Sequence, residues 1–392
     1  MTYRTAVLKQ SIEFVLIFPI VLVGKLAGKL FPLKPEHDIF LFFPSADIGG
    51  SVKVNADITE GIKERKPLII FSKKPKNNKF LPLFRDQGVR YIDLSPKIDN
   101  KLFHFVNIFY RGVLASWINA VPKPVVFGGE SLYFYKVIPH LKDSTKIIEL
   151  CHLNTWFNYS QAFISKIDVR VFSTLKIKRD VEKQYKENNI ANRFYERLQF
   201  IDNSIDIPTY KEINNDILQV LYVGRGAPQK RVHLLVQIAE KAKQLGLPVH
   251  FTFVGDVGDY FTDETRQFCS LLGQIQDKNE LNDIYLRSDV LILTSKYEGL
   301  PLVVMDMMAR GKVILSTAVD GIPDYITHQQ NGLLITETDE TKIVDSAIQM
   351  LELLIKQPEL KIKIGKEAYN YAQQKFSRFH FDEFYSSLLT SR

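Results

Sequence analysis

Residues 290–308 read VLILTSKYEGLPLVVMDMM and decide the fold. The apolar run Val290–Leu293 predicts a buried parallel strand, and the apolar residues after Pro301 predict a helix that begins at once. Pro301 suits the first helical position because its missing N–H would be unpaired there, and Gly299 lets other backbone approach closely. The start of such a helix presents free amides and a positive dipole end, which favour a phosphate. The stretch therefore predicts an α/β fold with an anion site.

Two acids stand in this stretch, Glu298 in the loop and Asp306 in the helix. A carboxylate beside a phosphate would repel it, so each acid is better suited to accept hydrogen bonds from neutral hydroxyls, which sugars supply. The alternative is structural. Glu298 would then be a solvated loop residue, and Asp306 would pair with Arg310 one helical turn later, which is worth only about a few tenths of a kcal/mol.

The chain of 392 residues is long enough for two domains, each with its own core. The two cysteines, Cys151 and Cys269, lie far apart and lack metal-ligand spacing, so we expect both to be reduced, as in a cytosolic protein. Residues 1–210 contain 31 Lys and Arg against 20 Asp and Glu, a net charge of +11, whereas residues 211–392 contain 20 against 24, a net charge of −4. Only the first half is expected to meet an anionic surface.

The N-terminal segment, residues 1–35, favours a membrane as that surface. Its apolar run is bracketed by Glu13 and Lys25, which leave only eleven uncharged residues between them, too few for a spanning helix of about 20. An amphipathic segment of this kind can lie in the membrane interface with its lysines at the headgroups. It makes a poor cleaved signal peptide, because Glu13 precedes the apolar run. The alternative is a buried helix that covers the sheet.

Strand-like and helical patterns alternate through most of the chain, which predicts parallel sheets with right-handed crossovers. Gly49 and Gly50 follow the first strand, residues 38–44, and open a helix. The predicted organisation has five parts: an N-terminal segment over 1–35, an N-terminal domain over 36–202, a linker over 203–216, a C-terminal domain over 217–375, and a final helix over 376–392 that packs back on the first domain.

A second strand, turn and helix begin the C-terminal domain. Residues 218–223 are the strand, and the loop that follows, residues 224–231, carries three cations at the strand's carboxyl end. The loop matches neither the P-loop motif nor the GxGxxG motif. It is therefore either a cluster of basic residues that binds an anion or a solvated turn.

Several motifs in the second half occur in a recognisable order: Gly224-Arg225 with Lys230, Phe253-Val254-Gly255-Asp256, Leu272-Gly273, residues 297–301, Gly321-Ile322-Pro323-Asp324 and Asn331-Gly332-Leu333-Leu334. Residues 217–380 thereby resemble glycosyltransferase family 4, and the first half resembles it more loosely through Gly49-Gly50, His152 and residues 202–206. The resemblance implies the GT-B fold, which is two Rossmann-like α/β domains facing across a cleft. It also implies a nucleotide-diphosphate sugar as donor, retention at the anomeric carbon, no cofactor and no metal.

The resemblance also implies roles for individual residues. The donor diphosphate would meet Arg225, Lys230, Gly49 and Gly50; the donor sugar and phosphate would meet Glu298, Gly299, Leu300, Pro301, Leu302 and Val303; the ribose would meet Asp306; and the base would lie near Gly255, Gly273 and Ile275. His152 would stand with Glu298 at the reaction centre, and Glu130 is a candidate contact for the acceptor, unless it caps the helix after it. Asp306 departs from the family, which usually has glutamate there, so its reach is shorter by about one carbon–carbon bond.

The sequence thus predicts a retaining, metal-independent hexosyltransferase that moves a sugar to a saccharide or lipid-linked acceptor in bacterial surface polysaccharide or glycolipid synthesis. We expect it in the cytoplasm, peripheral on the inner face of the plasma membrane, with an anionic membrane surface and no nucleic acid among its partners. Two alternatives remain: a GT-B epimerase or phosphorylase, and a non-catalytic sugar-nucleotide binder at the membrane.

Overall fold

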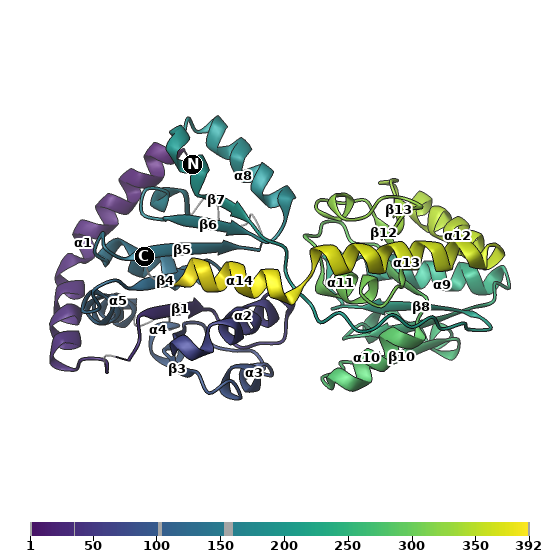
Figure 1. Ribbon diagram of the computed structural model, residues 1–392, viewed down its shortest axis with the longest axis horizontal. Helices are drawn as coiled ribbons and strands as arrows, with labels where there is room; N and C mark the ends of the chain where they lie inside the picture. Colours follow the sequence, from purple (N-terminus) through teal and green to yellow (C-terminus); the bar gives the residue numbers. More distant parts are fainter. Residues whose placement is uncertain (1, 35, 101–103, 153–159, 391–392) are drawn as a thin grey trace. The chain divides into compact units, whose positions relative to one another are not determined.

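The computed structural model describes residues 2–34, 36–100, 104–152 and 160–390, and the chain forms two compact units (Figure 1). The first unit comprises Met1–Asp202 with Phe379–Arg392, and the second comprises Asn203–Arg378. Residues 203–216, predicted as a linker, cluster with the second unit. Each unit is a parallel α/β structure and is described by itself.

The first unit is built on a parallel sheet with the strand order β3-β2-β1-β4-β5-β6-β7. The order reverses at β1, which pairs with β2 on one side and β4 on the other, so loops from both halves meet at the carboxyl ends of these strands. The strands are β1 (Ile39–Phe43), β2 (Leu68–Phe71), β3 (Arg90–Asp93), β4 (Val125–Gly128), β5 (Lys146–Cys151), β6 (Val169–Phe172) and β7 (Leu198–Phe200).

Helices flank this sheet, and the last of them comes from the far end of the chain (Figure 1). Tyr385 of α14 packs edge-on against Phe127 of β4, so the final helix belongs to the core of the first unit. The helices are α1 (Tyr3–Leu30), α2 (Gly50–Gly61), α3 (Leu81–Arg85), α4 (Ser95–Ile98), α5 (His104–Asn119), α6 (Leu132–Val137), α8 (Leu175–Glu187) and α14 (Arg378–Leu389), with short 3-10 turns η1 (Lys63–Arg65), η2 (Ile138–His140), η4 (Gln161–Phe163) and η5 (Asn192–Arg197).

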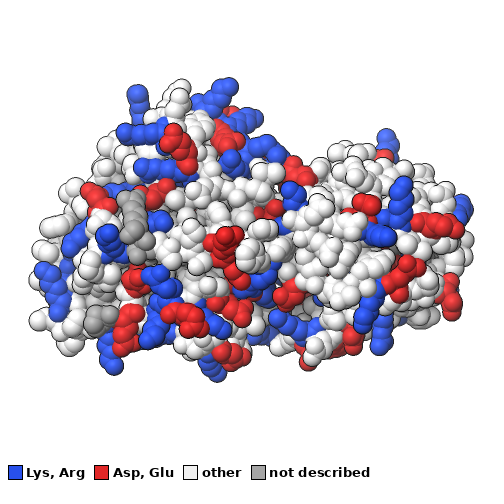
Figure 2. Space-filling view, in the orientation of Figure 1, with Lys and Arg blue, Asp and Glu red and all other residues white. Residues whose placement is uncertain are grey.

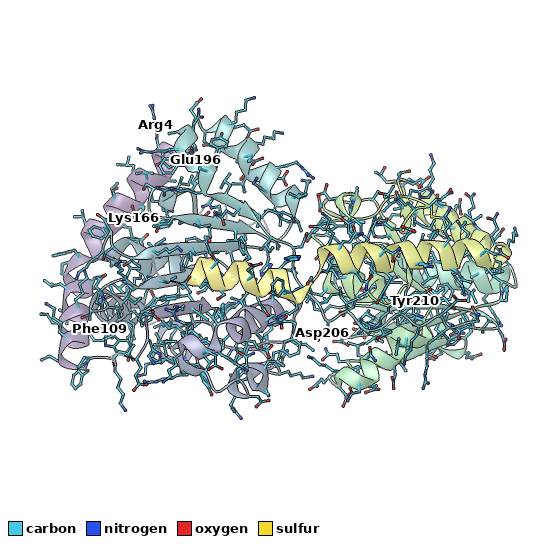
Figure 3. The ribbon with its side chains drawn as sticks, in the orientation of Figure 1. Arg4, Phe109, Lys166, Glu196, Asp206 and Tyr210 are labelled. Carbon is cyan, nitrogen blue, oxygen red and sulfur yellow. The ribbon has the colours of Figure 1, made fainter. Side chains whose placement is uncertain are left out.

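The N-terminal helix α1 crosses α5 in close contact. A Cβ atom at Gly24 would lie 2.0 Å from the carbonyl oxygen of Phe109, and one at Gly112 would lie 2.1 Å from that of Val21. Glycine at both positions lets the two backbones touch, as small residues do where helices pack in membranes. Figure 3 shows Phe109 where α1 and α5 run together.

Two charges within α1, Glu13 and Lys25, lie on the side of the helix that faces the unit. Glu13 accepts hydrogen bonds from Arg111 at 3.0 Å and from Lys136 at 2.7 Å, and Lys25 is half-buried. The apolar run was predicted to be too short to span a membrane because these two charges bracket it. The helix is instead 28 residues long, and by length and composition alone it could cross one. A core helix or a signal sequence passes the same test, so length by itself decides nothing.

The second unit has the strand order β10-β9-β8-β11-β12-β13, again parallel throughout. Here β8 and β11 are the central neighbours, which brings the loops after residues 223 and 293 together. The strands are β8 (Leu218–Val223), β9 (Val249–Val254), β10 (Cys269–Gly273), β11 (Val290–Leu293), β12 (Val313–Thr317) and β13 (Leu333–Ile335).

The helices of the second unit precede the final helix of the chain, which differs in its bounds from the sequence prediction. The final helix, predicted over 376–392, begins at Arg378 in α14, while Phe376 is fully buried in the second core. One helix of this unit begins at Lys278, where Asp277 caps it. The helices are α9 (Val232–Gln244), α10 (Lys278–Arg287), α11 (Leu302–Met308), α12 (Glu340–Lys356) and α13 (Pro358–Lys375), with 3-10 turns η6 (Pro228–Lys230), η7 (Gly258–Tyr260), η8 (Thr265–Gln267) and η9 (Ile322–Asp324).

His140 lies buried beneath α1, with its ring stacked on that of Phe14 at a centroid distance of 5.1 Å. Burial lowers the pKa of His140 to about 4; Lys25 and Arg111 act in the same direction, and Glu13 opposes them. At pH values between about 6.5, the ordinary pKa of histidine, and 4, His140 is therefore protonated more in the unfolded chain than in the folded chain.

The first unit should consequently lose stability as the pH falls from about 6.5 toward 4, by about 1 kcal/mol from His140 at a pH of about 5.5. In His140→Phe this part of the pH dependence should disappear, whereas replacement of the exposed His380 by Phe should leave it unchanged. Urea unfolding of the three proteins at about pH 7.5 and 5.5 measures it. An equal loss in His140→Phe and the parent chain would contradict this explanation.

Candidate functional site

An ion pair joins the ends of the two central strands of the second unit. Lys230, in the loop after β8, places Nζ 2.5 Å from Oε1 of Glu298, in the loop after β11. The hydroxyl of Ser295 donates to the same carboxylate oxygen at 2.6 Å. Glu298 is only 8% exposed, so it is not the solvated loop residue of the structural alternative. Two residues named from the sequence are thus brought together, and Ser295 was missed.

The backbone of the Glu298 loop is also fixed. Its amide donates to Oδ2 of Asp320 at 3.0 Å, and its carbonyl oxygen accepts from the amide of Gly321 at 3.2 Å. A Cβ atom at Gly321 would lie 2.9 Å from the carbonyl oxygen of Gly299, so glycine is needed for this approach. Sequence reasoning did not single out Asp320; its only signal is its position directly before the Gly321 motif.

The three cations of the loop after β8 have separate surroundings. Arg231 donates from Nε to the carbonyl oxygen of Thr294 at 2.6 Å and from Nη2 to that of Ser295 at 3.0 Å, which ties the loop to the end of β11. Arg225 is exposed and forms no ion pair with any residue that the structure describes. The loop therefore has one structural cation, one cation paired with Glu298, and one that faces solvent.

The start of α11 lies directly beside this pair. Pro301, predicted at the first helical position, is instead the residue before the helix, and its carbonyl oxygen accepts from the amide of Val304 at 2.9 Å. Within the described parts of the chain, the amides of Leu302 and Val303 donate to no protein acceptor. Leu300 is buried. The predicted sugar and phosphate loop thus contains two first-turn amides with no acceptor among the described residues.

Asp306, the predicted ribose ligand, is engaged in an ion pair. Nη1 of Arg310 lies 3.3 Å from its Oδ1, which is the structural alternative considered from the sequence. Arg310 also donates twice to Asn282, at 2.9 and 2.8 Å, and its guanidinium lies over the ring of Tyr285. The side chain of Asp306 keeps 27% of its surface exposed. Its role toward a ribose stays a prediction.

The predicted base region lies at three neighbouring strand ends. Gly255 has a φ of +125°, and a Cβ atom there would lie 1.9 Å from the carbonyl oxygen of Gly224. The amide of Gly255 donates to the carbonyl oxygen of Gly273 at 2.7 Å, while Ile275 is partly buried against the second core. Gly255 therefore sets the spacing of the loops after β8, β9 and β10.

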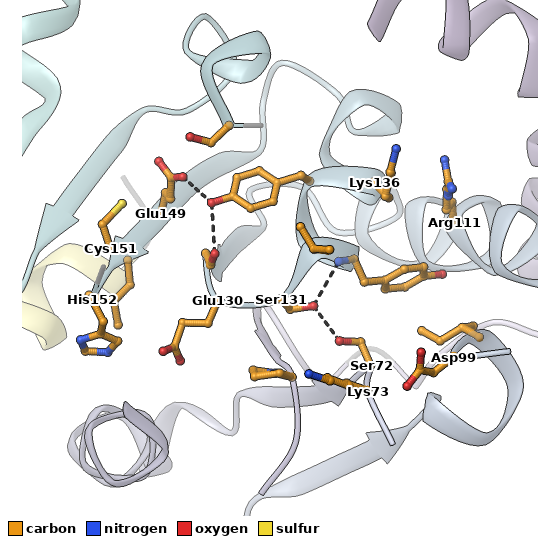
Figure 4. A pocket seen from close by; sticks show the side chains of 18 of the residues that line it. Ser72, Lys73, Asp99, Arg111, Glu130, Ser131, Lys136, Glu149, Cys151 and His152 are labelled. Carbon is orange, nitrogen blue, oxygen red and sulfur yellow. Dashed lines mark hydrogen bonds between the residues drawn. The ribbon is translucent and has the colours of Figure 1, made fainter. Parts of the chain in front are cut away.

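A separate cavity of about 490 Å³ opens in the first unit, and Figure 4 shows the side chains that line it. Its wall contains a buried ion pair between Glu149 and Arg170, and the hydroxyl of Tyr135 donates to Glu149. A hydrogen bond between Ser72 and Ser131, 2.6 Å long, holds the ends of β2 and β4 together. Sequence reasoning missed this buried charge cluster.

His152 and Glu130, named from the sequence, both line this cavity. Burial lowers the pKa of His152, and the charge of Glu130 partly offsets this. Nε2 of His152 is buried and has no hydrogen-bond partner among the described residues. Glu130 accepts from Asn55 at 2.7 Å and does not cap α6; the cap is Ser131, whose hydroxyl accepts from the amide of Tyr133. The capping alternative for Glu130 is therefore wrong.

Gly49 and Gly50 stand at the carboxyl end of β1, where Gly49 precedes α2 and Gly50 is its first residue. A Cβ atom at Gly49 would meet nothing within 4 Å. Both glycines belong to the first unit and Arg225 and Lys230 to the second, so neither unit alone unites the four predicted diphosphate contacts.

The two units, each a parallel sheet whose ligand-facing loops lie at the carboxyl strand ends, define the class of GT-B proteins. The chain superposes on Anabaena HepE in complex with UDP-glucose with a TM-score of 0.70, covering 90% of this chain and 98% of that one at 15% identity. A glycosyltransferase from Rickettsia africae gives a TM-score of 0.69, covering 91% and 100% at 15% identity.

The sequence comparisons match part of the chain to glycosyltransferases. Residues 206–371 match the family described as glycosyl transferases group 1. N-acetyl-alpha-D-glucosaminyl L-malate synthase of Bacillus anthracis is 29% identical over 122 residues, which are 28% of this chain and 31% of that protein. The chain thus spans less than a third of that curated relative. The match lies in the second unit, so this part of the chain is similar to the glycosyl transferases group 1.

Gly255→Ala tests how the strand ends of the site are spaced. The added methyl must displace the Gly224 carbonyl at a φ unfavourable to alanine, so the second unit should lose about 2 kcal/mol or more. Gly246→Ala is the matched control, because Gly246 has a φ of +64° but open space around its Cβ position, and about 1 kcal/mol is expected. Equal losses in denaturant unfolding would show that the contact with Gly224 does not matter.

Proposed function

We propose that the chain is a retaining glycosyltransferase that moves a sugar from a nucleotide-diphosphate sugar to a saccharide or lipid-linked acceptor, without a bound metal or cofactor. The observation that carries the proposal is the pair of Lys230 and Glu298 beside the free amides of α11. The GT-B fold and the sequence family support the same reaction class.

Lys230 is suited to the donor diphosphate. An ammonium group forms charge-assisted hydrogen bonds with phosphate oxygens, and the exposed Arg225 and the amides of Leu302 and Val303 add further donors at the same strand ends. A bound diphosphate carries more negative charge than the single carboxylate of Glu298, so it would draw Lys230 away from this partner. These groups would then stabilise the charge that grows on the leaving diphosphate.

Glu298 is suited to the donor sugar. When Lys230 turns to the diphosphate, the carboxylate keeps its bond from Ser295 and gains free acceptor capacity for sugar hydroxyls. The loop stays in place meanwhile, because Asp320 and Gly321 hold its backbone. The contacts with Lys230 and Ser295 therefore orient the acid for the incoming donor.

The chemical step needs no protein nucleophile under this proposal. The acceptor hydroxyl would attack the anomeric carbon on the face from which the diphosphate leaves, and a donor phosphate oxygen would take the hydroxyl proton, which retains the anomeric configuration. The cavity with His152 and Glu130 is the proposed place for the acceptor. Burial keeps His152 neutral at neutral pH, so its free Nε2 can hydrogen-bond a sugar hydroxyl.

We infer the cellular setting from the resemblance of the sequence to glycosyltransferase family 4. A cytoplasmic enzyme peripheral to the inner face of the plasma membrane would meet both sugar nucleotides and lipid-linked acceptors, as synthesis of bacterial surface polysaccharides or glycolipids requires. Incubation with a panel of sugar nucleotides and lipid-linked saccharides tests the activity. If the chain binds nucleotide but neither hydrolyses a donor nor transfers its sugar, it is a non-catalytic binder.

Substitutions of Lys230 and Glu298 should have different effects on nucleotide affinity and on the rate of sugar transfer. Lys230→Met should weaken nucleoside diphosphate binding by roughly 10- to 100-fold, because a charge-assisted bond is lost. Glu298→Gln should leave that affinity equal or higher, since Lys230 no longer has a competing carboxylate, while transfer falls roughly 100-fold or more. Calorimetry with UDP, GDP and ADP, followed by transfer assays, measures both quantities.

The control is Lys243→Met, which removes an equal charge from the exposed end of α9. Its affinity and rate should match those of the parent chain. Unaltered diphosphate affinity in Lys230→Met would show that Lys230 does not bind the diphosphate. Undiminished transfer in Glu298→Gln would show that Glu298 has no role in the reaction.

A further inference from the structure

One face of α1 is apolar and has no partner among the residues of the first unit that the structure describes. Its exposed side chains recur every three or four positions, which places them on one side of a helix. Leu16 is 73% exposed and Val23 is 58% exposed, whereas apolar residues are normally exposed only singly. The exposed large apolar residues of this outer face are Leu8, Ile12, Val15, Leu16, Phe18, Ile20, Leu22, Val23, Leu26 and Leu30, with Phe31 just beyond the helix.

The charges around the outer face all have one sign. Glu13 is the only acid in α1, and it is paired inside the unit with Arg111 and Lys136. The exposed charges of the helix are basic and lie toward its ends, with Arg4 and Lys9 at one end and Lys29 at the other; Figure 3 labels Arg4. Figure 2 shows the edge of the first unit along α1 as largely uncharged. The outer face is therefore an apolar strip of roughly 30 Å between cationic ends.

The inner face of α1 is attached along its whole length. Near the start, the amide of Tyr3 donates to Asn188; near the end, the indole of Trp117 donates to the carbonyl oxygen of Phe31 at 2.8 Å. Between them, a Cβ atom at Gly28 would lie 2.7 Å from that of Ser116. A helix held in this way cannot be surrounded by lipid unless it leaves the unit. Its axis is fixed to α5 instead.

We propose that α1 is an in-plane membrane helix whose outer face inserts into an anionic phospholipid bilayer while its inner face stays on the first unit. Apolar burial supplies the main attraction, and the lysines and arginine at the ends meet lipid phosphates. A second copy of this chain fits less well, because a two-fold contact through the same face would bring like charges together. The proposal concerns the attachment of the protein and does not depend on its reaction.

The attachment has one consequence that rests on the proposed function. Arg111 and Lys136, which hold Glu13 of α1, also line the cavity of the first unit. The membrane face and the proposed acceptor cavity are thus connected by one cluster of side chains. An acceptor carried on a lipid would enter the cavity from the surface to which α1 is bound.

Acidic substitutions on the outer face test the proposal. Leu16→Glu together with Val23→Glu should reduce binding to vesicles of phosphatidylglycerol and phosphatidylcholine by roughly tenfold or more in a flotation assay. Both side chains are exposed, so the fold and the affinity for UDP should not change, and circular dichroism and calorimetry verify this. High salt should weaken the binding of the parent chain without abolishing it.

The matched control adds the same two charges elsewhere. Ile217→Glu together with Leu245→Glu replaces exposed apolar residues of the second unit and should leave vesicle binding within about twofold of the parent chain. An equal loss of vesicle binding in both double variants would show that only the net charge of the protein matters, and it would overturn the proposal. Unchanged binding in Leu16→Glu with Val23→Glu would overturn it too.

Depth measurements distinguish the in-plane helix from a spanning one. Spin labels would be placed in turn at residues 8, 16, 23 and 30 of a chain in which Cys151 and Cys269 are replaced by alanine. The in-plane arrangement predicts one similar, shallow depth at all four positions when vesicles are added. A deep centre with shallow ends would show a spanning helix. Labels that contact each other between chains and are insensitive to lipid would show a dimer face, and either result contradicts the proposal.

Discussion

The ion pair between Lys230 and Glu298 is the interaction on which the candidate site depends. The two residues are 68 positions apart in the chain, and they meet only because β8 and β11 are adjacent in the sheet. Glu298 is nearly buried, where an uncompensated carboxylate would be costly, so it requires a partner. That partner is Lys230, a cation that under the proposed function turns to the donor diphosphate. A single contact thus stabilises the loop and contains both groups that we propose for binding a sugar nucleotide.

A similar arrangement holds the first unit to its N-terminal helix. Glu13 interrupts the apolar sequence of α1, but it faces inward and is satisfied by Arg111 and Lys136. The outward side of the helix is left free of acids, which is what a surface for anionic lipid requires. In both units, a partly or largely buried glutamate is paired with basic side chains of the same unit. Under our two proposals, Lys230 turns from its acid to phosphate, and the outer face of α1 binds lipid.

Much of the fold could be predicted from the sequence, because alternating apolar runs and glycine turns report local structure directly. The strand at residues 290–293 and the positions of Lys230 and Glu298 at strand ends follow from that pattern. Other features required the tertiary structure. The inward direction of Glu13, the contacts of Arg310 with Asn282 and Tyr285, and the buried pair of Glu149 and Arg170 each depend on a partner far away in the chain or on which face a helix buries. Nothing in the local sequence specifies those choices.

A crystal structure of the chain with a bound nucleotide-diphosphate sugar tests the central claim most directly. We predict that Nζ of Lys230 lies within hydrogen-bonding distance of a diphosphate oxygen, that Glu298 accepts from sugar hydroxyls, and that Ser295 still donates to that acid. A structure in which Lys230 and Glu298 remain paired with each other while the diphosphate is held elsewhere would contradict it.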